Sequence, residues 1–199
     1  DGRLEQPPGD WMLLSEASVM STKLNLIIRP EGEYRIDVSA LGDARHELTL
    51  RYRNPLPEWA AGKDPALVEQ LMYQGLYGGY LRLFAPGGAS TPYVAIDGSP
   101  TSPEDAGSEG GKDWAGVLLT VPAGQTREVR FAWTVALAAR SSGEYELYIQ
   151  KQPGTAGMCL ALSVTRDGRP ARDLVVDGGN RDAQGRVCLS TDVRVRARF

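Results

Sequence analysis

Apolar and polar residues alternate along residues 127–164 in a pattern that is typical of β-strands. The apolar positions form three sets: Val129, Phe131, Trp133, Val135 and Leu137, then Tyr145, Leu147 and Ile149, then Leu160, Leu162 and Val164. Because neighbouring side chains of a strand point to opposite faces, each set lies on one face of its strand. We therefore expect three successive strands that together form one wall of a hydrophobic core.

The same alternation predicts a hairpin earlier in the chain, over residues 34–40 and 48–53 on either side of Gly42. One face of this hairpin is expected to be buried and the other solvated. Further apolar segments predict strands over residues 11–20, 23–29, 78–85, 114–121, 174–176 and 186–199. The total is ten to twelve strands.

One helix is expected over residues 65–74. Asp64 is a suitable N-cap, Pro65 suits the first helical position, and Gly75 can end the helix. Its apolar residues recur at helical spacing: Leu67, Val68, Leu71 and Met72. We interpret this stripe as core contact at an open end of the sandwich rather than as a binding surface for a partner.

Residues 97–113 are poor in apolar residues and mostly acidic, so we expect a mobile surface loop there. The prediction for the whole chain is an all-β, predominantly antiparallel β-sandwich, Ig-like or jelly-roll-like, with one short helix. We expect a single domain over residues 1–199. Two packed β units, residues 1–125 and 126–199, are the alternative.

Composition narrows the classes of partner. The chain has 199 residues, 42% of them hydrophobic, and a net charge of -3 with both signs mixed along its length. This balance favours neither a nucleic-acid footprint nor an electrostatic membrane patch. The sequence starts at Asp1 without Met, so we expect a piece of a longer protein whose targeting segment lies upstream.

The two cysteines lie on matching faces of two predicted strands. Cys159 is out of phase with Leu160 and Leu162, and Cys188 is out of phase with Val187 and Leu189. If these strands pair antiparallel, the two side chains can form a cross-strand disulfide, which would indicate an oxidising compartment. Two free, half-buried thiols in a cytosolic protein are the alternative.

Residues for catalysis or metal binding are scarce. His46 is the only histidine, no nucleophile motif accompanies it, and we interpret it as a solvated residue at a strand end. Asn180, Asp182 and Gln184 loosely resemble a calcium loop, but Thr191 stands where a Glu is needed, which favours an ordinary turn. We therefore predict no catalytic residues, no metal and no cofactor.

Aromatic residues outside the alternating strands are the remaining candidates for ligand contact. Trp59 lies in a connecting segment, and Tyr73, Tyr77 and Tyr80 cluster around glycines near the end of the predicted helix. Such rings can stack on sugars or peptides, and they can equally cap the open end of a sandwich. Both interpretations stay open, with capping favoured.

Five segments between residues 7 and 155 carry a resemblance to a known family. They are PPGDWMLLSEAS, KLNLIIR, LTLRYRNP, GGYLRLFAPGG and YIQKQPGT. In order and spacing they resemble the C-terminal region of a bacterial family of membrane-anchored proteins, domain of unknown function four-thousand-and-twelve. The resemblance covers most of the chain from Pro7 to Val164. Ser18 departs from the pattern, because an Asn commonly stands there, and a role that rests on that Asn is in doubt here.

The resemblance implies an upstream membrane anchor, an extracytoplasmic location and an association with exopolysaccharide or cell-envelope genes. It implies no catalytic residues. Our first hypothesis is a non-catalytic module of a bacterial cell-envelope protein that binds glycan or a protein partner. The alternatives are a purely structural spacer, and an accessory domain of an envelope-polysaccharide enzyme whose catalytic part lies upstream.

Overall fold

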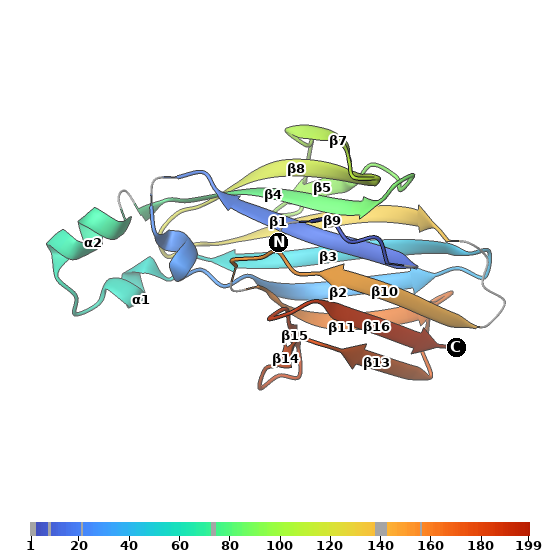
Figure 1. Cartoon of the computed structure of the whole chain (residues 1–199). Helices are drawn as coiled ribbons and strands as arrows, with labels where there is room; N and C mark the ends of the chain where they lie inside the picture. Colours follow the sequence, from blue (N-terminus) through green and yellow to red (C-terminus); the bar gives the residue numbers. More distant parts are fainter. Residues whose placement is uncertain (1–2, 8, 21, 73–74, 138–142, 156) are drawn as a thin grey trace.

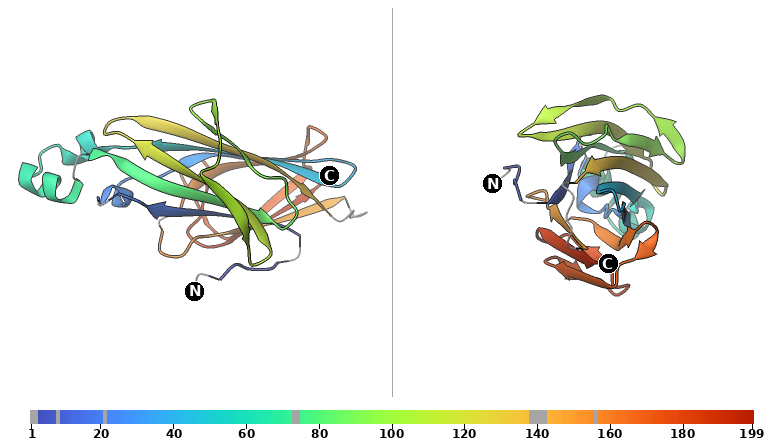
Figure 2. Two further views of the ribbon diagram at one scale, coloured as in Figure 1. Left: turned by 90° about the horizontal axis from the view of Figure 1, so that it is seen from above. Right: turned by 90° about the vertical axis from the view of Figure 1, so that its right-hand side faces the viewer.

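The computed structural model describes residues 3–7, 9–20, 22–72, 75–137, 143–155 and 157–199. They form an elongated sandwich of two β-sheets with sixteen strands (Figure 1), which confirms the predicted all-β class. The end-on view in Figure 2 shows the two layers facing each other. Among the described residues, no helix has both the length and the apolar character needed to cross a membrane.

The first sheet has seven strands, and all neighbours are antiparallel except the central pair β1 and β10. In order across the sheet the strands are β13 (Asp173–Asp177), β16 (Val193–Arg198), β10 (Glu144–Gln150), β1 (Asp10–Ser18), β4 (Tyr77–Pro86), β8 (Lys112–Val121) and β7 (Asp105–Glu109).

The second sheet has nine strands and is also mostly antiparallel, with one parallel pair, β2 and β11. Its order is β14 (Asn180–Arg181), β15 (Val187–Cys188), β11 (Cys159–Arg166), β2 (Glu31–Val38), β3 (Asp43–Arg53), β9 (Thr126–Ala136), β5 (Tyr93–Ile96) and β6 (Ser99–Thr101), with β12 (Arg169–Pro170) beside β11.

The hydrophobic core fills the space between the two sheets. The predicted hairpin of β2 and β3 presents Tyr34, Ile36 and Leu48 to this core, while Arg35 and Arg45 on the opposite face are exposed. The expectation of one buried and one solvated face is therefore confirmed.

The prediction that three successive strands form one wall is wrong. β9 and β11 belong to the nine-stranded sheet, whereas β10 lies between β1 and β16 in the seven-stranded sheet. The chain thus crosses the core twice within residues 127–164. Alternation shows which face of a strand is apolar. Because both sheets bury an apolar face in the same core, the pattern cannot show to which sheet a strand belongs.

The predicted helix is present as α2 (Pro65–Met72), preceded by a short helix α1 (Leu56–Ala60) that the pattern did not indicate. Asp64 caps α2, since its Oδ1 accepts a hydrogen bond from the backbone N–H of Ala66 at 2.9 Å. Both helices lie at one end of the sandwich, seen on the left in Figure 1.

The strand expected over residues 23–29 is wrong. The segment forms a short 3-10 helix, η1 (Leu24–Leu26), in which the backbone N–H groups of Ile27 and Ile28 both bond to the carbonyl of Leu24 at 3.0 Å. Leu24 and Ile28 are the buried residues, and their spacing of four is helical rather than alternating.

The loop expected over residues 97–113 is also wrong, because β6, β7 and the start of β8 occupy this segment. Two tight turns organise it. Asp97 and Gly98 join β5 to β6 with φ of 48° and 76°, and Gly110 and Gly111 join β7 to β8 with φ of 57° and 75°. Positive φ at both central residues is the geometry of two-residue hairpins, so backbone pairing forms these strands without apolar burial.

Candidate functional site

Strand β1 carries two carboxylates on its inner face. Asp10 and Glu16 are in phase with Met12 and Leu14, which belong to the main core, while Trp11 faces the outer side of the sheet. Each carboxylate meets tyrosine hydroxyls. The two ends of β1 therefore hold separate polar clusters.

Asp10 is completely buried and holds the first cluster together. Its Oδ2 accepts a hydrogen bond from the hydroxyl of Tyr145 at 2.7 Å, and its Oδ1 accepts one from the backbone N–H of Trp11 at 2.7 Å. The Nε2 atom of His46 lies 3.0 Å from Oδ2, although the ring N–H does not point straight at that oxygen. The Nδ1 atom of His46 lies 3.0 Å from the hydroxyl of Tyr34.

The expectation of a solvated His46 is wrong, because this residue is only 2% exposed. It has the same phase along β3 as Leu48 and Leu50, which alternation had placed on the buried face. Its ring stacks on Trp133, with centroids 4.7 Å apart and planes 8° apart. Tyr34 and Asp10 lie beside the two ring nitrogens of His46, each at 3.0 Å.

Burial sets the protonation of this cluster. It raises the pKa of the Tyr34 and Tyr145 hydroxyls well above the usual range, and the negative charge of Asp10 raises them further. Both hydroxyls therefore stay protonated, and that of Tyr145 donates to Asp10.

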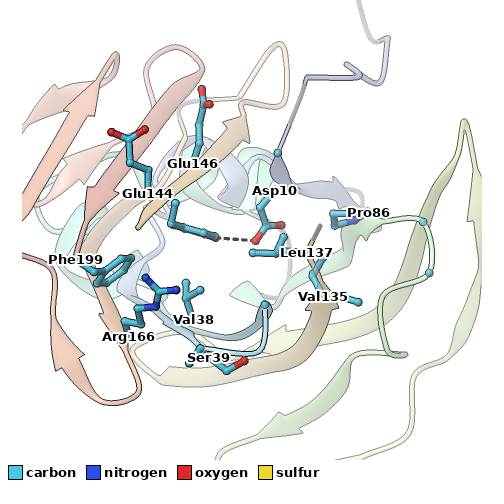
Figure 3. A pocket seen from close by; sticks show the side chains of 17 residues that line it. Asp10, Val38, Ser39, Pro86, Val135, Leu137, Glu144, Glu146, Arg166 and Phe199 are labelled. Carbon is cyan, nitrogen blue, oxygen red and sulfur yellow. Dashed lines mark hydrogen bonds between the residues drawn. The ribbon is translucent and has the colours of Figure 1, made fainter. Parts of the chain in front are cut away.

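A pocket of about 480 Å³ opens next to this cluster, at the end of the sandwich opposite α1 and α2 (Figures 1 and 3). Turns and strand ends from both sheets form its wall: Gly9, Asp10, Val38, Ser39, Ala40, Gly42, Pro86, Gly87, Gly88, Val135, Ala136, Leu137, Glu144, Tyr145, Glu146, Arg166 and Phe199. We call it the end pocket. Its volume lies within the range of small-molecule sites.

The side chains around the end pocket differ in direction. In Figure 3 the guanidinium of Arg166 points into the space between Phe199 and Val38, whereas the carboxylates of Glu144 and Glu146 point away from it. Among the described residues, the wall of the pocket therefore combines apolar side chains, polar groups and one cation, with the Asp10 cluster behind its floor.

The second polar cluster lies at the other end of β1. The hydroxyls of Tyr52 and Tyr77 both donate to the carboxylate of Glu16, and burial raises the pKa of both hydroxyls. The side chain of Gln152 bonds to the backbone of Glu16 through both its oxygen, at 2.6 Å, and its nitrogen, at 3.0 Å. The cavity beside Glu16 measures only about 170 Å³, so the end pocket is the stronger candidate site.

The structure does not bring the predicted aromatic residues together. Tyr77 is fully buried in the core, so its expected exposure is wrong, and Tyr80 lies on the outer face of β4 with its hydroxyl bonded to Asp105. Trp59 is half-buried against the core, with the ammonium of Lys63 4.5 Å from its ring centre. Tyr73 lies outside the described residues.

The predicted disulfide is confirmed. Cys159 and Cys188 occupy paired positions of the antiparallel strands β11 and β15 and are bonded to each other. The neighbouring Leu160 and Val187 point into the core, as alternation required.

The loose calcium motif forms a turn. Asp182 Oδ1 accepts backbone hydrogen bonds from Gln184 at 3.0 Å and Arg186 at 2.8 Å, and its Oδ2 pairs with the Arg186 side chain at 2.6 Å. These hydrogen bonds lower the pKa of the Asp182 carboxyl. Asp182 also lies near both cysteine sulfurs, but these are joined to each other and do not provide thiolate ligands.

Comparisons with known proteins show similarity in fold. No protein-family model matches the chain, and no curated protein matches it. Among solved structures, a candidate nutrient binding protein from Legionella pneumophila superposes with a TM-score of 0.55 at 10% identity, over 94% of this chain and 70% of that chain. At this identity the similarity shows the fold alone.

Two peptidase structures also superpose on this chain, with lower TM-scores. An M1 zinc metallopeptidase from Deinococcus radiodurans has a TM-score of 0.36 at 9% identity, over 86% of this chain and 38% of that chain. Aminopeptidase A from Legionella pneumophila has a TM-score of 0.38 at 9% identity, over 86% of this chain and 21% of that chain. This chain therefore spans well under half the length of either peptidase.

Sequence reasoning missed the end pocket and its polar floor. One signal was available, since His46 continues the buried phase of Leu48 and Leu50. Asp10 and Arg166 carried no such signal. They lie at the ends of strands from different sheets, and only the packing of the sheets brings them to one pocket.

Proposed function

We propose that the chain is a non-catalytic binding module of a bacterial cell-envelope protein, and that it takes a small molecule or one end of a glycan into the end pocket. The observation that carries this proposal is the pocket itself. It has a ligand-sized volume and a wall of both apolar and polar groups, and the buried residues Asp10, Tyr145 and His46 lie together beside it.

Two observations support the extracytoplasmic part of the proposal, and a third supports ligand binding. The disulfide between Cys159 and Cys188 is of a kind that persists in oxidising compartments. The five segments that resemble domain of unknown function four-thousand-and-twelve suggest membership in that anchored envelope family. The Legionella protein of similar fold is a candidate nutrient binding protein, which is compatible with a ligand site on this fold.

The experiment tests the proposal by filling the entrance of the end pocket with a bulky side chain. Ala40 is exposed in the turn between β2 and β3 and lines the end pocket. Ala40→Trp should fill the mouth, whereas Ala161→Trp places the same ring on the exposed outer face of β11, away from the pocket. The parent chain and both variants are screened by thermal unfolding against envelope oligosaccharides and small metabolites.

At least one ligand should stabilise the parent and the Ala161→Trp variant but not the Ala40→Trp variant. At a ligand concentration of one hundred times Kd the gain is about 2.7 kcal/mol, which such a scan detects readily. If no compound binds, or if Ala40→Trp binds as well as the parent, the structural spacer becomes the better hypothesis.

A further inference from the structure

We propose that the end pocket selects ligands in which a carboxylate is attached to an apolar body, and that Arg166 binds this carboxylate. The inference rests on the proposed function, since it requires that the pocket be occupied. It goes further by naming the chemical class of the ligand and the residue that recognises it.

Within the described residues, Arg166 is a cation without a carboxylate partner. It is the last residue of β11 and is half-buried, and its guanidinium carbon lies 5.6 Å from the centre of the Phe199 ring. No ion pair joins Arg166 to a carboxylate anywhere in the part of the chain that the structure describes. Nearby arginines differ, since Arg198 pairs with Glu144 at 2.9 Å and Arg196 pairs with Asp177 at 2.5 Å.

The carboxylates nearest the pocket are directed elsewhere. Glu144 is held by Arg198 on the outer face of β10, and Figure 3 shows its carboxylate turned away from the cavity. Asp10 is fully buried, and its oxygens already accept from the Tyr145 hydroxyl and the Trp11 N–H. Glu146 also lines the pocket, and Figure 3 shows its carboxylate turned away, so among the described lining residues the charge directed into the cavity is that of Arg166.

Geometry favours a carboxylate as the partner of this cation. The planar guanidinium presents paired N–H donors that match the two oxygens of a carboxylate, and its cation–π contact with Phe199 keeps the cation beside the pocket wall. Partial burial strengthens such a charge-assisted pair relative to one in water.

The remaining wall determines the body of the ligand. Val38, Pro86, Val135 and Leu137 line the pocket together with Phe199, and none of these side chains can form a hydrogen bond. A hydroxyl group placed against these side chains would lose hydration without gaining a hydrogen bond, so this part of the wall favours an apolar group. An apolar chain or ring with a carboxylate at one end satisfies both the wall and Arg166.

The test uses three probes of nearly the same shape: phenylacetate, phenylacetamide and phenethylamine. Binding to the full chain is measured by calorimetry at low salt. Arg166→Gln removes the cation and keeps a polar side chain, and Arg169→Gln is the matched control on the exposed strand β12, outside the pocket wall. Circular dichroism and thermal unfolding establish that both variants are folded.

Phenylacetate should bind more tightly than the amide, and the amine should bind most weakly. Arg166→Gln should weaken phenylacetate binding by about ten-fold or more, the usual effect of losing a hydrogen bond to a charged group, while Arg169→Gln leaves it unchanged. Equal binding of acid and amide, tighter binding of the amine, or full binding by Arg166→Gln would overturn the inference.

The failure of this inference can be separated from failure of the proposed function. If amide and acid bind equally and Ala40→Trp abolishes both, the pocket is a binding site without selectivity for carboxylates. If none of the three probes binds and no compound in the wider screen binds either, both proposals fail together.

Discussion

At the scale of single residues, tyrosine hydroxyls stabilise two buried or half-buried carboxylates. Tyr145 donates to Asp10, and Tyr52 and Tyr77 donate to Glu16. Breaking one of these hydrogen bonds leaves part of a carboxylate unsatisfied inside the protein, which typically costs about 1 to 3 kcal/mol. The same burial links folding to pH, because it raises the pKa of each hydroxyl.

This linkage predicts a loss of stability in alkali. In the unfolded chain these tyrosines ionise near their ordinary pKa of 10.0, while in the folded chain the raised pKa keeps them protonated. Above about pH 10 the folded state therefore binds more protons, and the free energy of unfolding falls with pH by about 1.4 kcal/mol per unit for each such tyrosine. Urea unfolding from about pH 9 to about pH 11 measures the slope.

Two comparisons make the pH prediction specific. Tyr145→Phe should lower the free energy of unfolding near neutral pH and reduce the alkaline slope by one proton. Lys112 acts in the opposite direction: burial lowers its pKa, so its contribution to stability rises with pH up to 10.5, but several tyrosines outweigh one lysine above that pH. A slope that is unaffected by Tyr145→Phe would contradict the assignment.

At the scale of elements, the disulfide lies just before the point where the chain passes from the nine-stranded sheet to the seven-stranded sheet. β15 has only two residues, and the next strand, β16, lies in the opposite sheet. Two backbone-paired residues contribute little stability by themselves. The disulfide between Cys159 and Cys188 therefore holds β15 against β11.

Removing this bond should destabilise the whole fold. The two cysteines are 29 residues apart, and closing a loop of that size contributes about 3 to 4 kcal/mol on the chain-entropy estimate. We expect a loss of this size in urea unfolding of the Cys159→Ala, Cys188→Ala double variant. Reduction of the parent chain with dithiothreitol, which changes no residue, is the matched control, and a loss well below about 1 kcal/mol in both would refute the estimate.

At the scale of the whole molecule, both sheets contain strands from before and after residue 125. The two parallel pairs, β1 with β10 and β2 with β11, each join one strand from residues 1–125 to one from residues 126–199. The main core cluster contains buried residues from both ranges, and β9 of residues 126–199 lies between β3 and β5 of residues 1–125.

This interleaving predicts one cooperative unfolding transition for the full chain. Tryptophan fluorescence and far-ultraviolet circular dichroism should report the same midpoint in urea. A fragment limited to residues 1–125 should remain unfolded, because its apolar faces would be exposed. Two separate transitions would instead favour two packed units.

The sequence by itself determined the local features of this protein. Alternation placed β2, β3, β9, β10 and β11 and predicted which face of each strand is buried, and it put both cysteines on the face where they are bonded. These features depend on neighbours along the chain and on a period of two, so a local pattern contains them. Turn residues are local signals too: Asp97 with Gly98 indicates a hairpin in the segment expected to be a loop.

The tertiary structure decided the rest. It assigned β10 to the opposite sheet from β9 and β11, buried His46 against Trp133, and brought Asp10 and Arg166 to the end pocket. The physical reason is that sheet membership comes from pairing between strands far apart in the chain. A residue's own neighbourhood records that it points inward, but not what it will meet there.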